Sequence, residues 1–459
     1  MADQNKGTQA ATATKQPYSY TYSSNFLEPD WRRIPGYKEV SESDWNSALW
    51  QKRNFIKTVA QLKQVLGAFL TDAMALDILK DQAERSTMSM LVPPQMINTM
   101  RVEDFKNDPV RLYMIPFFSD RNKNWPSHPK AGRDSLHEHE MWVTEGLTHR
   151  YPTKVLAELL STCPQYCGHC TRMDLVGQSV PQVPKRKFET PQKERHELIL
   201  DYLRKTPSVR DVVVSGGDIA NLPSQTLEAF VSGLLDIENI RDIRLATKGL
   251  MGVPQHFLQD EVLRTLDRIG KKSVERGVSV AIHTHINHAE SLTPLVAKVA
   301  RKMLAMGFRD VRNQGVLLKG VNDSQKDLLD LCFKLQDHGG ITPYYFYMCD
   351  MIPNAEHWRV SLADAQSLQH DIMGYLPGFA TPRIVCDVPF VGKRWVHQIH
   401  SYDQVKGISY WSKNYLTSIE GDTPEALSQL YEYYDPIDGL PAEGQSYWAE
   451  EGKKILNVT

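Results

Sequence analysis

The stretch Cys163-Pro-Gln-Tyr-Cys167-Gly-His-Cys170 places three cysteines at CxxxCxxC spacing. Residues 155–160, just before it, form a short apolar run that ends at a turn signal, which predicts a strand. The cysteines then lie in the loop that follows the C-terminal end of this strand, where α/β barrels carry their chemistry. We therefore expect a parallel barrel whose first strand leads directly into a metal centre.

The chemistry of the three thiolates narrows the kind of centre. Thiolates are soft ligands that suit iron–sulfur clusters or zinc. Three of them leave one iron of a four-iron cube open to a small molecule, and an open iron is what cleavage of S-adenosylmethionine to a 5′-deoxyadenosyl radical requires. Two other interpretations stay open at this point: a structural zinc site with a fourth ligand such as His169, and unpaired core cysteines.

Composition limits the class of protein. The 459 residues suffice for a large domain with additions, and a net charge of -2 gives no basic excess that would favour nucleic acid or a membrane surface. No apolar run reaches the length of about 18 residues that a membrane span needs, and the N-terminus lacks an apolar signal core. Six cysteines, three of them clustered, favour a reducing compartment over a disulfide framework. We expect a cytoplasmic, oxygen-sensitive protein.

The N-terminal part of the chain predicts a tail followed by helices. Residues 1–29 are expected to be a disordered tail, since the first part of this segment is rich in Ala, Thr, Gln and Lys and carries no pattern. Residues 30–145 are expected to form a helical region. Apolar residues recur at helical spacing over residues 45–70, with Ser43 as the N-cap, and a second helix is expected over residues 72–85.

A regular alternation begins near residue 150. Apolar runs of strand length occur at 155–160, 211–215, 242–247, 278–283, 310–318, 342–348 and 383–388. Amphipathic stretches of helix length separate them, at 190–206, 224–236, 257–275, 291–306, 324–337 and 361–374. Such alternation predicts an α/β fold with a parallel sheet, closed as a partial or full TIM-type barrel over residues 146–394. Residues 395–459 are aromatic, polar and loop-rich, and we expect a C-terminal extension there.

Two acidic residues and a lysine follow the last two predicted strands. Asp350 ends the run Tyr344-Tyr-Phe-Tyr-Met-Cys-Asp, and Asp387 is followed six residues later by Lys393. A lysine in such a loop can form a Schiff base with pyridoxal phosphate, although most loop lysines are simply solvated. Two carboxylates that face one pocket repel unless a cation lies between them. They can bind a substrate ammonium or pair with a nearby cation, namely Arg359, Lys393 or Arg394.

Weaker patterns accompany these. They are Ser215-Gly216-Gly217-Asp218 after the second predicted strand, Gln314 on the fifth, Arg150 and Lys154 leading into the first, Arg172 two residues past Cys170, and the group His283, His285 and His288 after the fourth. Glycines allow a backbone to approach a ligand closely, and guanidinium groups bind phosphate or carboxylate strongly. Each pattern alone is as consistent with a turn, a surface pair or a packed core as with a binding site.

The motifs together resemble the lysine 2,3-aminomutase family of radical S-adenosylmethionine enzymes. The resemblance runs from about Trp45 to about Val396 and includes, in order, LTHRYPTKVL, CxxxCxxCTR, SGGD, HTHINH, NQGVLLKGVND, YYFYMCD and CDVP…GK. It implies a radical-type (β/α) barrel with a [4Fe-4S] cluster, S-adenosylmethionine and pyridoxal 5′-phosphate as cofactors. The implied cluster ligands are Cys163, Cys167 and Cys170. The residues implied to contact the cluster and its S-adenosylmethionine are His169, Ser215, Gly216, Gly217, Asp218 and Gln314.

The resemblance also implies roles around the second cofactor and the substrate. Lys393 matches the lysine that holds pyridoxal phosphate through a Schiff base, and Arg150 and Lys154 match basic residues around that cofactor. Arg172 matches the arginine that binds the substrate carboxylate, while Asp350 and Asp387 match the aspartates that bind its ε-ammonium. The implied reaction moves the α-amino group of L-lysine, or of a similar basic amino acid, to the β carbon. The alternatives are another radical reaction on an amino acid and a non-catalytic metal-binding protein.

Some positions depart from the family pattern. Ser324 follows Gly320-Val-Asn-Asp where a zinc-binding cysteine is usual, and the last cysteine of the chain is Cys386, so no structural zinc is expected. Lys154 replaces an arginine, and Gly168 and the pair Met173-Asp174 replace basic residues. We expect a divergent subgroup with a small amino acid substrate, a low-potential electron donor, a homo-oligomeric state, and neither nucleic acid nor membrane as a partner.

Overall fold

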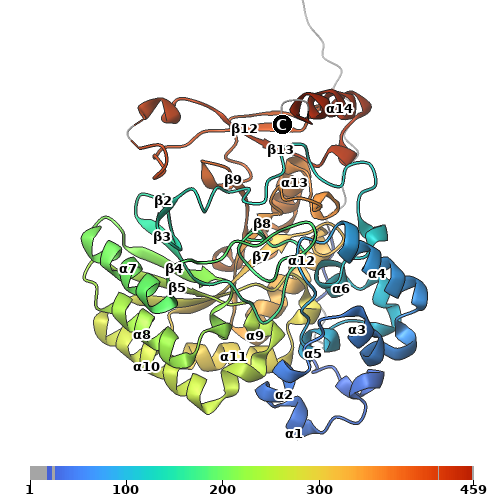
Figure 1. The fold of residues 1–459 in the computed structure, drawn as a ribbon, viewed down its shortest axis with the longest axis vertical. Coiled ribbons are helices and arrows are strands. Elements are labelled where there is room, and N and C mark those ends of the chain that lie inside the picture. The colour runs from blue at the N-terminus through green and yellow to red at the C-terminus, as the bar shows by residue number, and fades with distance from the viewer. Residues whose placement is uncertain (1–17, 23–25, 422, 457–459) are drawn as a thin grey trace, which may run out of the picture.

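The computed structural model describes residues 18–22, 26–421 and 423–456. Among these, ten strands form one sheet in chain order, β1 to β10 (Figure 1). Their bounds are β1 Trp142–Thr144, β2 Leu147–Tyr151, β3 Lys154–Leu160, β4 Asp211–Gly216, β5 Asp242–Ala246, β6 Ser279–Thr284, β7 Asp310–Leu317, β8 Thr342–Met348, β9 Arg383–Val388 and β10 Gly392–Trp395. Strands β3 to β9 run parallel, and β1, β2 and β10 add antiparallel hairpins at the two edges.

Helices between the parallel strands cover the outside of the sheet (Figure 1). They are α7 Gln192–Lys205, α8 Ser224–Leu235, α10 Asp260–Arg276, α11 Pro294–Ala305, α12 Gln325–Lys334 and α13 Leu362–Ile372. The predicted alternation is therefore confirmed, and every predicted parallel strand begins and ends within one residue of the observed one. The reason is physical: a parallel strand buried on both faces is an almost continuous apolar run, as the adjacent residues Ile384 and Val385 in β9 illustrate.

The sheet is a partial TIM-type barrel whose opening is bridged by side chains. Arg150 on β2 donates one hydrogen bond to Asp387 Oδ1 at 2.8 Å and another to the carbonyl of Val388 at 2.7 Å, both on β9. The backbone N–H of Lys393 on β10 donates to the hydroxyl of Tyr151 at 3.1 Å. The two ends of the sheet thus meet through polar contacts instead of a strand ladder, and these contacts surround the lysine and acid noted in the sequence.

The helical N-terminal region differs from the sequence-based expectation. The apolar spacing over residues 45–70 corresponds to three short helices, α1 Glu42–Trp45, α2 Ala48–Arg53 and α3 Val59–Leu66, instead of one continuous pattern. Their N-caps are Ser41, Ser47 and Thr58, and not Ser43. Each polar cap accepts a backbone N–H and starts a new helix, which interrupts the previous one. The second expected helix is confirmed as α4 Asp72–Glu84; α5 Pro94–Asn98 and α6 Pro109–Met114 follow it.

The expected tail over residues 1–29 falls partly outside the described residues, namely at 1–17 and 23–25. The described part packs against the barrel. The ring of Tyr20 stacks on Phe333 with centroids 5.2 Å apart, and its hydroxyl donates to Asp330 at 2.7 Å. The ring of Phe26 stacks on His338 at 3.9 Å. The prediction of a disordered tail therefore extended too far along the chain, because the aromatic residues here are separated by polar ones and form no regular pattern in the sequence.

The C-terminal extension is more regular than its sequence indicates. It contains a three-stranded antiparallel sheet, β11 Ser401–Asp403, β12 Ile408–Trp411 and β13 Tyr431–Tyr434, followed by α14 Ala442–Leu456. The aromatic residues judged loop-like are its core, since Trp411 and Tyr433 are buried. The hydroxyl of Tyr433 donates to the carbonyl of Cys349, beside Asp350, at 3.2 Å. Within the described residues, no helix has both the length and the apolar content that crossing a membrane would require.

Candidate active site

The three clustered cysteines lie in the loop after β3, as predicted. All three are free and partly exposed. Burial raises the pKa of Cys163 well above its usual value and that of Cys170 to about 11, and in both cases the neighbouring cysteines add to the increase. Buried thiols with raised pKa values need a positive centre to exist as thiolates, and iron provides one. The donor set therefore fits an iron–sulfur cluster.

The path of this loop explains the glycine at position 168. The N–H of Tyr166 donates to the carbonyl of Leu91, and that of Gly168 to the carbonyl of Tyr113, both at 3.1 Å. A Cβ on Gly168 would lie 2.4 Å from the ring of Trp358, so a basic side chain has no room here. His169, the fourth ligand considered for zinc, instead faces His285, with their Nε2 atoms 3.4 Å apart. Within the described residues, no three or more His, Cys, Asp or Glu side chains converge on one point that could hold a single metal ion.

The SGGD segment at the end of β4 supports the cysteine loop. A Cβ on Gly217 would lie 2.1 Å from the carbonyl oxygen of Thr162, and Gly216 adopts φ +103° against the backbone of Leu160. Ser215 is buried at the end of the strand. The glycines are thus required by close contact with the cysteine loop itself, whereas the sequence suggested close contact with a ligand.

The carboxylate of Asp218 is hydrogen-bonded to groups of the protein itself. Its carboxylate accepts hydrogen bonds from the N–H groups of Ala220, Lys248 and Gly249 and from the hydroxyl of Thr247, at 2.6–3.0 Å. The carboxylate thus fixes the turn after β5, and the implied contact of Asp218 with S-adenosylmethionine stays a prediction. Gln314, on β7, lies between His283 and Tyr347 and is hydrogen-bonded to both.

Lys393 and Asp387 are brought together by the β9–β10 hairpin. Their Cα atoms are paired in the ladder, and Lys393 Nζ lies 3.1 Å from Asp387 Oδ2. The turn between them holds Phe390 at φ +63° and Gly392 at φ +86°, and a Cβ on Gly392 would lie 2.5 Å from the hydroxyl of Tyr415. Burial alone would raise the pKa of Asp387, but the charges of Arg150 and Lys393 outweigh it and lower the pKa. Asp387 is therefore an ionised counter-charge between two cations.

Three cations surround the ring of Tyr151. The centroid of this ring lies 4.3 Å from Lys154 Nζ, 5.7 Å from Lys393 Nζ and 5.8 Å from the guanidinium carbon of Arg150. The Nε of Arg150 is buried and has no hydrogen-bond partner among the described residues. Since Asp387 neutralises only one of these charges, the neighbourhood fits an anionic group such as a phosphate, and it fits pyridoxal phosphate in particular because Lys393 supplies the amine.

Asp350 lies just after β8, next to Asp387, but its pKa is shifted in the opposite direction. Burial raises the pKa of Asp350 to about 8, and the charges of Asp387 and Glu138 add to the increase. The other cations considered as partners are engaged elsewhere, since Arg359 pairs with Glu356 at 2.7 Å and Arg394 donates to backbone carbonyls. The two aspartates lie side by side, as the sequence indicated, but only the charge of Asp387 is balanced by neighbouring cations. A cation brought to Asp350 would ionise it.

The raised pKa of Asp350 predicts a pH dependence of stability in the cofactor-free protein. Between the ordinary value of 3.8 and about 8, the folded chain holds a proton that the unfolded chain has lost. The free energy of unfolding should therefore fall as pH rises through this interval, by up to about 1.4 kcal/mol per pH unit from this group. Urea unfolding between pH 5 and 8 should show a shallower fall in Asp350→Asn than in the wild type. Equal slopes would contradict the assignment.

Arg172 is already occupied in this structure. Its Nε and Nη2 donate to the two carboxylate oxygens of Glu138 at 2.7 and 3.0 Å, and Glu158 Oε1 lies 3.2 Å from Nε. The resemblance implied that Arg172 binds the substrate carboxylate, but in this structure the carboxylate of Glu138 occupies its guanidinium. Sequence reasoning missed both glutamates. Glu158 left a signal, since it is the charged residue inside the apolar run at 155–160, and burial raises its pKa to about 8.

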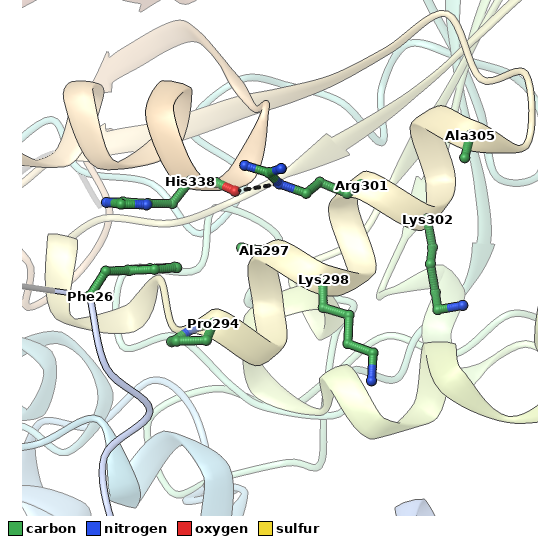
Figure 2. A pocket seen from close by; sticks show the side chains of 8 residues that line it. All are labelled: Phe26, Pro294, Ala297, Lys298, Arg301, Lys302, Ala305 and His338. Carbon is green, nitrogen blue, oxygen red and sulfur yellow. Dashed lines mark hydrogen bonds between the residues drawn. The ribbon is translucent and has the colours of Figure 1, made fainter.

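An open hollow also lies on the outside of the barrel, along α11 (Figure 2). Its lining residues are Phe26, Pro294, Ala297, Lys298, Arg301, Lys302, Ala305 and His338. Arg301 Nε donates to the carbonyl of His338 at 2.8 Å across one side of it. None of these residues belongs to the cysteine loop or to the β9–β10 hairpin, so the candidate chemistry lies elsewhere.

Comparison with known proteins adds relatives along most of the chain. The L-lysine 2,3-aminomutase of Clostridium subterminale is 31% identical over 366 residues, which cover 78% of this chain and 79% of that protein. The glutamate 2,3-aminomutase of Clostridioides difficile (strain 630) is 25% identical over 352 residues, 76% of each chain. A radical SAM methyltransferase structure from Sphaerobacter thermophilus aligns with a TM-score of 0.35 and 16% identity over 53% of this chain and 69% of that one. No family model matches the chain.

Proposed function

Because the chain belongs to the lysine 2,3-aminomutase family of radical S-adenosylmethionine enzymes, we propose that it is a pyridoxal-phosphate-dependent 2,3-aminomutase acting on L-lysine or a similar basic amino acid. The enzyme class, an aminomutase and hence an isomerase, follows from the relatives. The second cofactor and the substrate are our proposal. We also propose that a low-potential electron donor is its partner. Structural zinc is not among the cofactors that we propose.

The proposed substrate class rests on one observation: the buried carboxyl group of Asp350 lies beside the ionised carboxylate of Asp387. Asp387 already pairs with Arg150 and Lys393, whereas the pKa of Asp350 is raised to about 8. The ammonium group of a basic side chain would stabilise the ionised form of Asp350, whereas the carboxylate of a glutamate side chain would add a further negative charge. A site built in this way favours a substrate with a distal cation and rejects one without it.

The residues of the chain have separate tasks in this scheme. The bound cofactors supply the chemistry, since the cluster with S-adenosylmethionine provides a radical and pyridoxal phosphate holds the migrating nitrogen. Cys163, Cys167 and Cys170 would hold the cluster, and Lys393, Arg150 and Lys154 the pyridoxal phosphate. The protein otherwise orients the substrate and excludes water from the barrel.

Anaerobic incubation of the reconstituted enzyme with single amino acids tests the proposal. Lysine, arginine and ornithine should be offered separately with S-adenosylmethionine and a reductant, with glutamate as the matched control, and products analysed by mass for isomers of unchanged mass. An isomer from a basic amino acid and none from glutamate supports the proposal. An isomer from glutamate alone contradicts the substrate class, and 5′-deoxyadenosine without an isomer indicates a different radical reaction.

Replacing Asp350 by asparagine should weaken use of a basic substrate. Asparagine keeps the size of the side chain but cannot carry the negative charge, so the contact with the distal ammonium becomes neutral. Hydrogen bonds to charged groups contribute about 1.5–3 kcal/mol, so kcat/KM should fall about 10- to 100-fold. Iron content and bound pyridoxal phosphate should stay at the wild-type level. An unchanged kcat/KM would show that Asp350 does not bind the substrate.

A further inference from the structure

Lys248 points at the middle cysteine of the cluster motif. It lies two residues after the end of β5, and its Nζ lies 2.7 Å from Sγ of Cys167. The residue is buried, with 8% of its surface exposed. The ring of Tyr113 lies on another side of the amine, with its centroid 5.0 Å from Nζ. The position of Lys248 at the C-terminal end of a barrel strand is where such folds place residues that act on a ligand.

The backbone of Lys248 is held on both sides. Its N–H donates to Asp218 Oδ2 at 2.6 Å, and its carbonyl accepts a hydrogen bond from Gln165 Nε2 at 2.9 Å. Asp218 belongs to the loop after β4, and Gln165 belongs to the cysteine loop itself. The hydrogen bonds from Asp218 and Gln165 thus fix the backbone of Lys248 relative to the cysteine loop. A side chain anchored in this way loses little further entropy when it contacts its target.

The charges around this amine also favour an anionic sulfur. Across the described residues, no carboxylate forms an ion pair with the amine of Lys248, although the carboxylate of Asp218 accepts a hydrogen bond from its backbone N–H. The other titratable groups that face it are Cys163, His169 and His285, and none of these is a carboxylate. A buried ammonium without a counter-charge is costly. A cysteine bound to iron is a permanent thiolate and provides that counter-charge.

We propose that Lys248 is a positioning residue that raises the reduction potential of the cluster by donating an N–H···S hydrogen bond and a positive charge to Cys167. Reduction adds negative charge to the cluster, so a fixed cation beside one of its sulfurs stabilises the reduced form. Hydrogen bonds to the sulfurs and net charge are among the properties that set such potentials. The inference deepens the proposed function and depends on the cluster that it includes.

Redox titration of the reconstituted holoenzyme, followed by electron paramagnetic resonance without substrate, tests this role. Lys248→Met removes the charge and the donor, Lys248→Gln removes the charge but keeps a donor, and Lys248→Arg keeps both. At a fixed potential, the ratio of reduced to oxidised cluster should fall at least tenfold in the methionine variant, which corresponds to about 59 mV for one electron. The arginine variant should match the wild type, with the glutamine variant between them.

Lys185→Met is the matched control. Lys185 is also a half-buried lysine near the cluster motif, but its amine donates to the backbone carbonyls of Thr87 and Met173 and to the thioether sulfur of Met88, and not to a cysteine sulfur. Its loss should shift the ratio clearly less than tenfold. An equal shift in this control would overturn the specific role of Lys248. So would a wild-type potential in a Lys248→Met protein that retains its full iron content.

A measurement on the wild type does not depend on the stability of any variant. Protein labelled with ¹⁵N in its lysine amines should show a ¹⁵N hyperfine coupling to the reduced cluster, because Nζ of Lys248 lies next to a ligating sulfur. Absence of this coupling would overturn the inference even if every variant failed to fold. A wild-type chain that binds no iron would instead contradict the proposed function, so the two failures are distinguishable.

Discussion

Replacing Asp387 by alanine is expected to lower the free energy of unfolding of the cofactor-free protein by about 3–5 kcal/mol. The side chains of Arg150 and Asp387 are 5% and 6% exposed and share a hydrogen bond of 2.8 Å. Removal of the carboxylate leaves a buried guanidinium without its counter-charge and also releases Lys393, 3.1 Å away. Because this pair bridges the opening of the barrel, the cost falls on the global fold. Urea unfolding at pH 7, followed by tryptophan fluorescence, measures it.

Asp350→Ala is the control for this loss. Asp350 lies beside Asp387 and is equally buried, yet its pKa is raised where that of Asp387 is lowered. At pH 7 the carboxyl of Asp350 is mostly protonated, and its removal does not take the counter-charge from Arg150 or Lys393, so the free energy of unfolding should change far less than in Asp387→Ala. Equal losses in the two variants would show that the cost comes from the cavity and not from the broken ion pair.

The barrel was predictable from the sequence because its parallel strands are buried on both faces. Strands such as β4 and β9 are apolar runs whose ends the sequence itself marks. The antiparallel strands were missed, since β1 has three residues and β10 four, too short for a period of two to appear. The sheet of the C-terminal extension was missed because its core is aromatic, and alternation of tyrosine with polar residues resembles a loop.

The site was predictable where its partners are close in sequence. Asp387 and Lys393 are six positions apart and face each other across one hairpin, so the motif contains the contact. The contacts of Arg172 with Glu138 and of Lys248 with Cys167 join residues 34 and 81 positions apart. Only the folded chain brings such residues together, and no local pattern signals them. For the same reason the sequence could not distinguish the two aspartates, whose difference lies in which one Arg150 reaches.

Lys393→Ala is expected to abolish retention of pyridoxal phosphate and to reduce aminomutase turnover at least about 10³-fold, equivalent to about 4 kcal/mol of transition-state stabilisation. A lysine amine is the group that can bind the aldehyde of this cofactor covalently. Lys393 Nζ lies within 6 Å of the rings of both Tyr151 and Tyr347, at the barrel mouth. The measurements are the visible absorbance of the bound cofactor and turnover with the preferred amino acid. Borohydride reduction followed by peptide mapping should place the cofactor on Lys393.

Lys393→Arg separates the chemistry of this lysine from its charge. Arginine keeps a cation beside Asp387, so urea stability should stay near that of the wild type, but a guanidinium does not bind the aldehyde and turnover should be lost. Iron content should be normal, since the cysteine loop contributes nothing to the β9–β10 hairpin ladder. Turnover in the arginine variant near the wild-type rate would mean that Lys393 is only an ion-pair partner of Asp387. In that case the cations around Tyr151 would not be assigned to binding of a cofactor phosphate.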